Sequence, residues 1–350
     1  RSSDLPEKRH PLKIVYARES FPPSVVSSIF LAGPTSRGDI PVSWRLEALA
    51  ILADLGYQGD VYVPETNPDV TSPFDYENQV EWETEALNRA DCILFWIPRS
   101  TELPGLTTND EWGAWKGSGK VVLGTPAGAW SVRYQKLFAE QNKIPCLSTL
   151  RETLEAAVSF VTPGRLRYGG ECHVPLHMWR AQSFRAWYLS QVHAGNSLKK
   201  TKVLWTYPPG KPFMWAMKAD IYVAAENRYK SNEVVISRTD IASVLLYRKG
   251  ATLMDTEIIL VKEFRSPVRN ESGFVCELPS GSSKDTESAT IEVALKEVEE
   301  EVGLRIDSSR IRVGHRKQVV STFSTHKCSL FYAEVTEEEI AQVKANPEPR

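Results

Sequence analysis

The sequence has few cysteines, no long apolar run and almost no net charge. Five cysteines, an odd number without Cys-x-x-Cys spacing, argue against a disulfide framework or a zinc site and favour a reducing, cytoplasmic location. No apolar run approaches the roughly 18 residues of a membrane span, and the first residues do not read as a signal peptide. A formal net charge of −2 gives no reason to expect a nucleic-acid partner. The sequence therefore predicts a protein that binds neither membranes nor nucleic acids.

The composition is that of an ordinary globular protein. Of the 350 residues, 42% are hydrophobic and 25% are charged, which supports folded domains, and this length predicts two to three of them. We expect a first domain at residues 1–150, a helical connector at 151–200 and a second domain at 201–350. The chain starts at Arg1 and ends in Pro-Glu-Pro-Arg, so we expect a fragment whose second domain is truncated at its C-terminus.

Residues 1–150 alternate short apolar runs with amphipathic stretches. Strands are predicted at 28–32, 61–64, 92–97 and 120–124, and helices at 43–55, at 77–89 and from 109 onward. Such alternation predicts an α/β domain with a flavodoxin-like parallel sheet. Ligands bind such sheets outside the carboxyl ends of the strands, so the loops there are the place to look for a site.

Three segments of this domain carry residues that can do chemistry: Phe30-Leu31-Ala32-Gly33-Pro34, Ala90-Asp91 and Thr107-Thr108-Asn109-Asp110-Glu111-Trp112-Gly113, the last followed by Gly119-Lys120. Together they resemble nucleoside 2-deoxyribosyltransferases over roughly residues 25 to 130. The resemblance implies that Glu111, in a Glu-x-Gly context, attacks the anomeric carbon of a sugar and that Asp91 holds the sugar or assists the base. It also implies substrate contacts from Gly33 and Asn109.

A glutamate suits the role that the resemblance gives to Glu111. A carboxylate is a competent nucleophile toward an oxocarbenium-like carbon, and the covalent glycosyl intermediate is then resolved by water or a second acceptor. A structural interpretation stays open for both acids. Glu111 would then be a helix N-terminal acid favoured by the helix dipole, and Asp91 a turn residue before a strand.

The connector predicted at 151–200 contains aromatic residues at helical spacing. Phe184, Trp187, Tyr188 and Val192 recur on one side of a helix. We therefore expect a helix packed against a neighbouring domain and not a free linker.

The second domain contains an acidic helix among predicted strands. Strands are expected at 219–224, 243–247, 257–261, 310–320 and 328–335, and a helix at 336–343. Glu297, Glu300 and Glu301 stand at i, i+3 and i+4, so a helix places their carboxylates on one face. Oxygen ligands grouped in this way favour Mg²⁺ or Mn²⁺ over softer metals. The alternative is an acidic face turned to water.

The stretch from Gly281 to Leu304 resembles the Nudix box, G-x5-E-x7-R-E-U-x-E-E-x-G-U with U aliphatic. The residues in register are Glu297, Val298, Glu300, Glu301, Gly303 and Leu304, and Gly281 and Glu287 have the correct mutual spacing. The stretch departs from the box in having one extra residue after Glu287 and Lys296 in place of arginine.

Two upstream segments resemble ADP-ribose pyrophosphatases of the same superfamily: Glu263-Phe264-Arg265-Ser266-Pro267 and Glu277-Leu278-Pro279-Ser280-Gly281. The Nudix resemblance implies an α/β/α sandwich with a mixed sheet and a metal ion held by Glu297, Glu300 and Glu301. It also implies catalysis through Glu300 and Glu301. Arg265 and Glu277 would contact the substrate.

These observations predict a bifunctional nucleotide-processing enzyme acting on a small nucleotide or nucleoside. The second domain would hydrolyse a nucleoside diphosphate linked to another group, as in ADP-ribose, and the first would cleave or exchange an N-glycosidic bond. The alternative is a nucleotide sensor in which one or both sites bind without turnover. The two box departures favour it, as do Phe30 and Gly105, where the transferase family often has a tyrosine and an acidic residue. The base, the sugar and a homodimeric state stay open.

Overall fold

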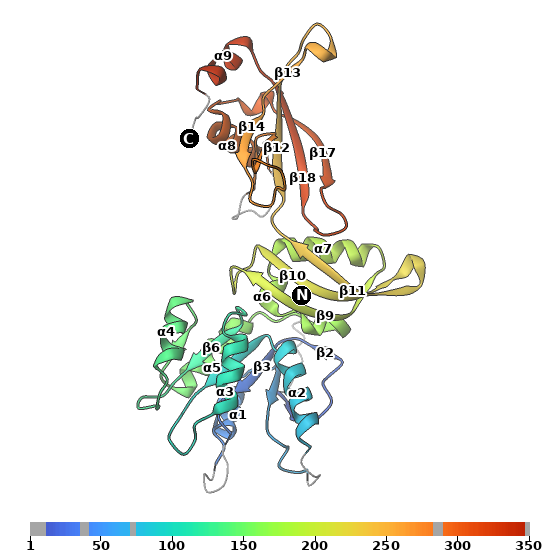
Figure 1. The fold of residues 1–350 in the computed structure, drawn as a ribbon. Coiled ribbons are helices and arrows are strands. Elements are labelled where there is room, and N and C mark those ends of the chain that lie inside the picture. The colour runs from blue at the N-terminus through green and yellow to red at the C-terminus, as the bar shows by residue number, and fades with distance from the viewer. Residues whose placement is uncertain (1–11, 36–41, 71–74, 283–289, 347–350) are drawn as a thin grey trace, which may run out of the picture. The chain divides into compact units, whose positions relative to one another are not determined.

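The computed structural model describes residues 12–35, 42–70, 75–282 and 290–346. Contacts between residues divide the chain into two compact units, Arg1–Val234 and Val235–Arg350 (Figure 1). This division differs from the boundaries predicted after residues 150 and 200, because residues 150–161 and 197–207 pack within the first unit.

A parallel sheet with helices between its strands forms the first part of this unit. The strands are β1 Lys13–Tyr16, β3 Ser28–Ala32, β4 Asp60–Val63, β5 Cys92–Trp96, β6 Val121–Gly124 and β7 Cys146–Leu147. The helices are α1 Trp44–Asp54, α2 Tyr76–Arg89, α3 Leu106–Trp115, α4 Arg133–Gln141 and α5 Leu150–Val161.

The strand order confirms the predicted parallel sheet. It is β1-β4-β3-β5-β6-β7, and every neighbouring pair runs parallel. Counted from β3, the strands β4 to β7 follow the order 2-1-3-4-5 of flavodoxin-like sheets. The edge strand β1 lies outside the strands predicted from the sequence.

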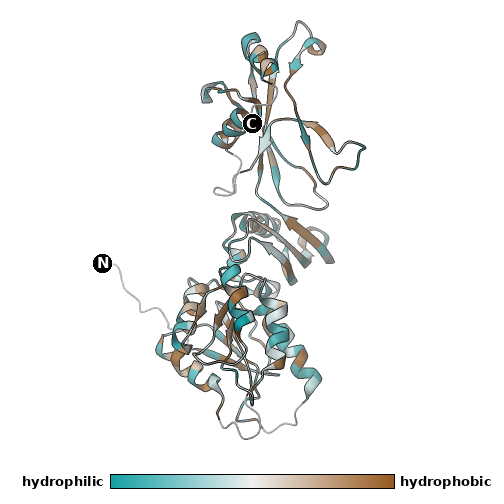
Figure 2. Ribbon diagram, turned by 60° about the vertical axis from the view of Figure 1, so that its left-hand side comes forward, coloured by the Kyte–Doolittle hydropathy of each residue, from teal (hydrophilic) through white to brown (hydrophobic). Residues whose placement is uncertain are grey.

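Helices cover both faces of this sheet. Ile29 and Leu31 of β3 lie in one buried cluster and Phe30 in another, because successive strand residues point to opposite faces. Helices α1 and α5 contribute to the first cluster, and α2, α3 and α4 to the second. Figure 2 shows the hydrophobic strands of the sheet enclosed between these helices.

Helix α5 belongs to the parallel-sheet domain and not to a connector. Leu154 and Ala157 are fully buried in the cluster on its face of the sheet. The chain then forms β8 (Arg167–Tyr168), which pairs with β2 (Ser24–Val25), and a short 3₁₀ helix η1 (Gly169–His173). The first domain therefore extends past the predicted boundary at residue 150, because this amphipathic helix completes the cover of the sheet.

The last part of the first unit contains a three-stranded sheet of order β11-β10-β9, in which β10 and β9 run antiparallel. The elements are α6 Leu176–Trp179, α7 Gln182–His193, β9 Ser197–Tyr207, β10 Met214–Val223, η2 Ala224–Glu226 and β11 Arg228–Ser237. Trp215 of β10 is fully buried, lies 5.5 Å from the ring of Phe184 and donates its Nε1–H to Ser183. Helix α7 thus packs on strands that follow it, and the predicted boundary after residue 200 falls inside β9.

The second unit contains a mixed sheet of order β13-β12-β18-β17, with β16 also paired to β12. Strands β12 and β18 run parallel, while β13, β16 and β17 pair antiparallel. Strands β14 and β15 form a separate antiparallel pair. The strands are β12 Ile241–Arg248, β13 Glu257–Ile258, β14 Val261–Phe264, β15 Phe274–Glu277, β16 Ser280–Gly281, β17 Arg312–Gln318 and β18 Lys327–Glu334. Two further 3₁₀ turns are η3 Leu253–Asp255 and η4 Ser308–Arg310.

Two helices bury against this sheet. They are α8 Ile291–Val302 and α9 Glu337–Ala345. Val298 of α8 and Ile340 of α9 share a buried cluster with Val244 of β12. The second unit is therefore mixed α/β, and the Nudix form of that architecture stays a prediction. Within the described residues, no helix is both long enough and apolar enough to cross a membrane.

Candidate active site

Arg45 of α1 holds the loop that follows β3. Its side chain is 1% exposed and donates hydrogen bonds to the carbonyl oxygens of Leu31 (3.0 Å) and Gly33 (2.7 Å). It also donates to the carboxylate of Glu65, which follows β4, at 2.6 Å. Burial lowers the pKa of the guanidinium, and the carboxylates of Glu65 and Glu111 counteract that effect. Arg45 therefore fixes a cation at the carboxyl edge of the sheet.

Gly33 and Gly105 bring two of the edge loops into close contact. A Cβ atom at Gly33 would overlap the carbonyl oxygen of Trp96 and lie 2.9 Å from the ring of Trp44, so this position requires glycine. Gly105 precedes α3 with φ at 60°, and a Cβ atom there would lie 2.8 Å from Pro34. An acidic residue in place of Gly105 would displace this loop. The predicted substrate-binding residue Gly33 thus shapes the site through its backbone.

Glu111 lies on α3 and is half-buried. The next residue, Trp112, anchors the helix, since it is 2% exposed and edge-on to Phe95 at 5.3 Å. Burial, followed by the carboxylate of Glu83, raises the pKa of Glu111 to about 8, and Arg45 opposes the rise. At pH 7 the free protein therefore holds a proton at this acidic site.

Glu83 of α2 is an acidic residue of this site that the sequence motifs do not single out. Gln79, one helical turn earlier, donates its amide to the Glu83 carboxylate at 2.7 Å and to the carbonyl oxygen of Pro64 at 3.3 Å. Burial raises the pKa of Glu83, while the Gln79 hydrogen bond and Arg45 lower it. Neighbouring carboxyl groups in a partly desolvated environment can share one proton. The ionised carboxylate can then act as nucleophile while the protonated carboxyl acts as acid.

Asn109 lies on the same helix as Glu111 but on a different side, because residues i and i+2 of a helix do not face each other. Its side-chain oxygen accepts hydrogen bonds from Arg99 at 2.6 Å and from Gln135 at 3.0 Å. These bonds join the loop after β5 to α3 and α4. The structure does not bring Asn109 together with Glu111, and a substrate contact from Asn109 stays a prediction.

Asp91 stands at the opposite end of β5 from the loop that leads to Glu111. It is fully buried, and both of its oxygens accept from the guanidinium of Arg167, with Nη1 to Oδ1 at 2.7 Å. The backbone N–H groups of Ser28 and Leu176 donate to it as well, each at 2.9 Å. These contacts are structural, and the catalytic role predicted for Asp91 stays a prediction. This carboxylate ties residues 167–176 to the amino edge of the sheet.

The carboxyl-edge loops, the half-buried Glu111 and the strands β3 to β6 lie in a segment with a known counterpart. Residues 26–129 match the model of a family described as nucleoside 2-deoxyribosyltransferase like. The match confirms the resemblance that the motifs indicate for this part of the chain, and the deoxyribosyltransferase-like domain includes both Glu83 and Glu111. None of the curated proteins compared with the chain matches it. The Nudix interpretation of residues 201–350 stays a prediction.

In the second unit, the predicted metal ligands lie on α8 but point to different partners. The backbone N–H of Ser280 donates to Glu301 at 3.0 Å, and a Cβ atom on Gly281 would overlap the carboxylate of Glu297. Glu300 lies 3.5 Å from Lys296. Across the part of the chain that the structure describes, no three acidic, histidine or cysteine side chains are grouped to hold a metal ion. A metal site on α8 therefore stays a prediction.

Arg265 and Glu277, both predicted to contact substrate, contact each other. Nε of Arg265 donates to Oε1 of Glu277 at 2.8 Å, and Nη2 lies 2.9 Å from Glu263. The hydrogen bond that Arg265 donates to Glu277 raises the pKa of Arg265. The structure thus brings these two residues together as an ion pair between the residue that follows β14 and the last residue of β15. The box residue Glu287 lies outside the described residues.

Proposed function

We propose that the deoxyribosyltransferase-like domain cleaves or exchanges the N-glycosidic bond of a nucleoside or nucleotide, with Glu111 as nucleophile and Glu83 as the acid and base. One observation carries this proposal. Two glutamates from different helices interact electrostatically, and the carboxylate of Glu83 adds to burial in raising the pKa of Glu111 to about 8. Paired acids of this kind serve glycosidic chemistry, which needs both a nucleophile and a proton donor.

The reactive form is the one in which the single proton of the pair lies on Glu83. An oxygen of the Glu111 carboxylate bonds to the anomeric carbon as the bond from that carbon to the base nitrogen breaks. The base leaves with that electron pair and takes the proton from Glu83. Water or the nitrogen of a second base then attacks the same carbon, the ester bond to Glu111 breaks, and the proton of the incoming group passes to Glu83. Arg45 orients the site by holding the Gly33 loop and opposing the build-up of negative charge.

Base release measured by chromatography tests this proposal. Wild-type protein is incubated with a panel of nucleosides, 2′-deoxynucleosides and their 5′-monophosphates. We expect Glu111→Gln to lower the rate at least about a hundredfold, and mass spectrometry of wild-type protein to show a glycosyl adduct on the α3 peptide. Glu140→Gln, on an exposed position of α4, is the matched control. Undiminished base release in Glu111→Gln would refute the nucleophile role.

We further propose that the second unit binds Mg²⁺ or Mn²⁺ through Glu297, Glu300 and Glu301 and hydrolyses a nucleoside diphosphate derivative. The proposal is supported by the approach of the Glu297 and Glu301 carboxylates to the Ser280–Gly281 segment. A bound divalent ion would neutralise diphosphate charge and lower the pKa of water. Glu300 must first leave Lys296. Incubation with ADP-ribose and Mg²⁺ should yield AMP, whereas tight binding of unchanged ADP-ribose would favour a sensor.

A further inference from the structure

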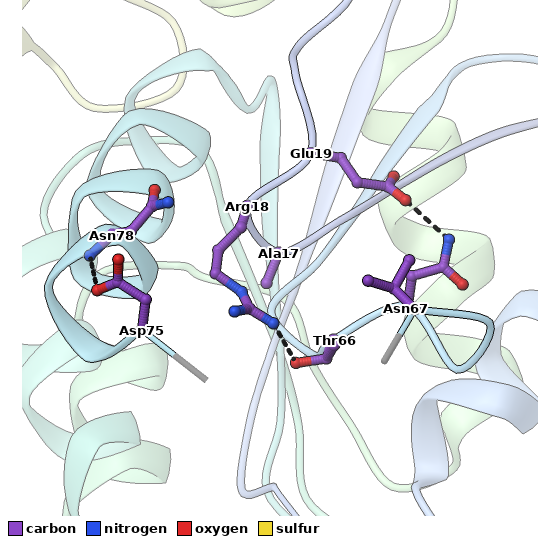
Figure 3. A pocket seen from close by; sticks show the side chains of 8 residues that line it. Ala17, Arg18, Glu19, Thr66, Asn67, Asp75 and Asn78 are labelled. Carbon is purple, nitrogen blue, oxygen red and sulfur yellow. Dashed lines mark hydrogen bonds between the residues drawn. The ribbon is translucent and has the colours of Figure 1, made fainter. Parts of the chain in front are cut away.

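A cavity of about 330 Å³ opens at the carboxyl ends of β1 and β4 (Figure 3). This volume lies at the lower end of the range for small-ligand pockets. One wall comes from residues 17–19, which precede the segment matched to the transferase family, and the other from residues 66–67 with Asp75 and Asn78, which lie within it. The added edge strand β1 thus supplies half of a cavity at the edge where parallel sheets bind ligands.

Glu65 connects this cavity to the candidate active site. The backbone N–H of Ala17 donates to the carbonyl oxygen of Glu65 at 3.0 Å, and the Glu65 carboxylate accepts from Arg45. Arg45 in turn interacts electrostatically with both Glu111 and Glu83. Glu65 therefore contacts both Ala17 of the cavity wall and the cation that interacts with the acidic pair.

Helix α2 gives the scale of the separation. It carries Asn78 at the cavity and Glu83 at the acidic pair, five positions further on. At 1.5 Å per residue and 3.6 residues per turn, these positions lie about 7.5 Å apart along the helix axis and about 140° apart around it. The cavity and the acidic pair therefore lie beside different sides of the same helix.

Arg18 is the cationic residue of the cavity wall. Its backbone has φ at 69°, in the left-handed region that costs free energy for a residue with a side chain, and such residues cluster at ligand sites. Its Nη2 donates to Oγ1 of Thr66 at 3.0 Å. Figure 3 shows the Arg18 side chain extending between the wall of Asp75 and Asn78 and that of Thr66.

The other charged groups of the cavity are acceptors. Glu19 accepts from the backbone N–H of Tyr16 at 2.9 Å and from the amide of Asn67 at 2.8 Å, and Asp75 accepts from the N–H of Asn78 at 3.2 Å. Each carboxylate oxygen can accept a second hydrogen bond. A phosphate group would be repelled by these two carboxylates. An uncharged ring whose edge carries both hydrogen-bond acceptors and hydrogen-bond donors matches a wall of one guanidinium and two carboxylates.

We infer that this cavity selects 6-oxopurine bases, with Arg18 as the specificity-determining residue. The O6 and N7 atoms of a 6-oxopurine are the acceptors that arginine binds with two hydrogen bonds, and the adjacent N1–H can donate to Asp75. Adenine presents an amino group at position 6, which is a second donor facing the guanidinium. The inference rests on the proposed glycosidic chemistry and names the base that leaves.

The test compares kcat/KM for base release from 2′-deoxyguanosine, 2′-deoxyinosine and 2′-deoxyadenosine. We expect wild-type protein to prefer the two 6-oxopurines by about tenfold or more, which is the scale of one bidentate contact. Arg18→Met should remove that preference. Its kcat/KM for 2′-deoxyadenosine should stay within about threefold of the wild-type value. Arg18→Gly should remove it as well, although glycine suits the backbone at this position. Arg133→Met, on an exposed position of α4, is the control and should keep the preference.

The outcomes separate this inference from the function on which it rests. A wild-type preference for adenine, or an equal loss on all three substrates in Arg18→Met, overturns the inference while the glycosidic function stands. Absence of base release from every nucleoside overturns the glycosidic function. In that case calorimetry with free hypoxanthine and free adenine decides. Binding of hypoxanthine that Arg18→Met weakens about tenfold supports the base selection, and equal binding of the two bases refutes it.

Discussion

The carboxylate of Glu83 on α2 adds to the burial that raises the pKa of Glu111 on α3. Both helices pack on the same face of the sheet, since Trp82 and Trp112 share one buried cluster. Arg45 reaches the two acids from α1, which covers the other face. Packing around the sheet edge therefore brings together an acidic pair and one cation that no local stretch of sequence contains.

The first prediction concerns stability and pH. The pKa of Glu111 is about 8 in the folded protein and 4.5 in its ordinary state, so between these values the folded protein holds a proton that the unfolded chain releases. The contribution of this proton to the free energy of unfolding is complete below about pH 4.5 and is lost as the pH rises to about 8. Because Glu111→Gln cannot ionise, its melting temperature should match wild type near pH 5 and exceed it by about 2–4 °C or more at pH 8.

Thermal unfolding from pH 5 to pH 9 measures this difference. Glu140→Gln, exposed on α4, should show no such dependence. A difference between Glu111→Gln and wild type that is the same at every pH would mean that Glu111 ionises in the folded protein as it does in the unfolded chain.

The second prediction separates a structural from a catalytic role for Asp91. Asp91→Ala leaves the buried guanidinium of Arg167 without its counter-charge, which costs about 3–5 kcal/mol of unfolding free energy. Arg151→Ala breaks an exposed pair with Asp54 and should cost under about 1 kcal/mol. Urea denaturation measures both. Where Asp91→Ala is folded, base release should stay within about threefold of wild type, and a hundredfold loss of rate at unchanged stability would support the catalytic role.

Local patterns predicted the buried strands well, and contacts between distant residues explain what they missed. Strand β3 is apolar on both faces and was predicted at 28–32, whereas β1 exposes Lys13 at the sheet edge and carries a weaker signal. Asp91 follows a helix and precedes a strand, and only the fold shows that Arg167 is its partner.

The same limit applies to the candidate site. Glu83 lies in the acidic run Glu81-Trp82-Glu83-Thr84-Glu85, which has the appearance of a solvated helix face. Its burial and its partner Gln79 become visible only when α2 packs against the loop after β4. By contrast, the Glu-x-Gly context of Glu111 is contiguous in the sequence, so the motif alone indicates this residue. Motifs identified one half of the acidic pair, and packing identified the other.

The third prediction compares two glycines of the site. A Cβ atom on Gly33 would overlap the carbonyl oxygen of Trp96, so Gly33→Ala must shift the loop that Arg45 holds. We expect base release to fall about a hundredfold, the scale of an ångström-sized misplacement. Gly113 has nothing within 4 Å of its Cβ position and lies inside α3, so Gly113→Ala should raise the unfolding free energy by about 0.5–1 kcal/mol. The rate of base release and urea denaturation, measured for both variants, test these two effects. Normal base release in Gly33→Ala would show that the loop position does not matter for the reaction.

The last prediction concerns Mg²⁺ binding by the second unit. Lys296 lies 3.5 Å from Glu300, with 71% and 45% of their side chains exposed, and such exposed helical pairs contribute about 0.3–0.5 kcal/mol. If Glu300 must leave Lys296 to bind the ion, Lys296→Gln should tighten Mg²⁺ binding about twofold in calorimetry. Glu300→Gln should abolish binding, because it removes one of three charged ligands.

Glu299→Gln is the matched control for that experiment. Glu299 lies on the same helix and is paired to Arg305 at 2.6 Å, so its loss changes the charge of α8 as much as the loss of Glu300 does. A metal site made of specific ligands requires Glu299→Gln to bind Mg²⁺ with nearly wild-type affinity. The contrary result is that Glu299→Gln and Glu300→Gln weaken Mg²⁺ binding equally, while Lys296→Gln changes it only as much as the loss of one positive charge does. The ion would then be attracted by the acidic helix as a whole, and the assignment of the three ligands would fail.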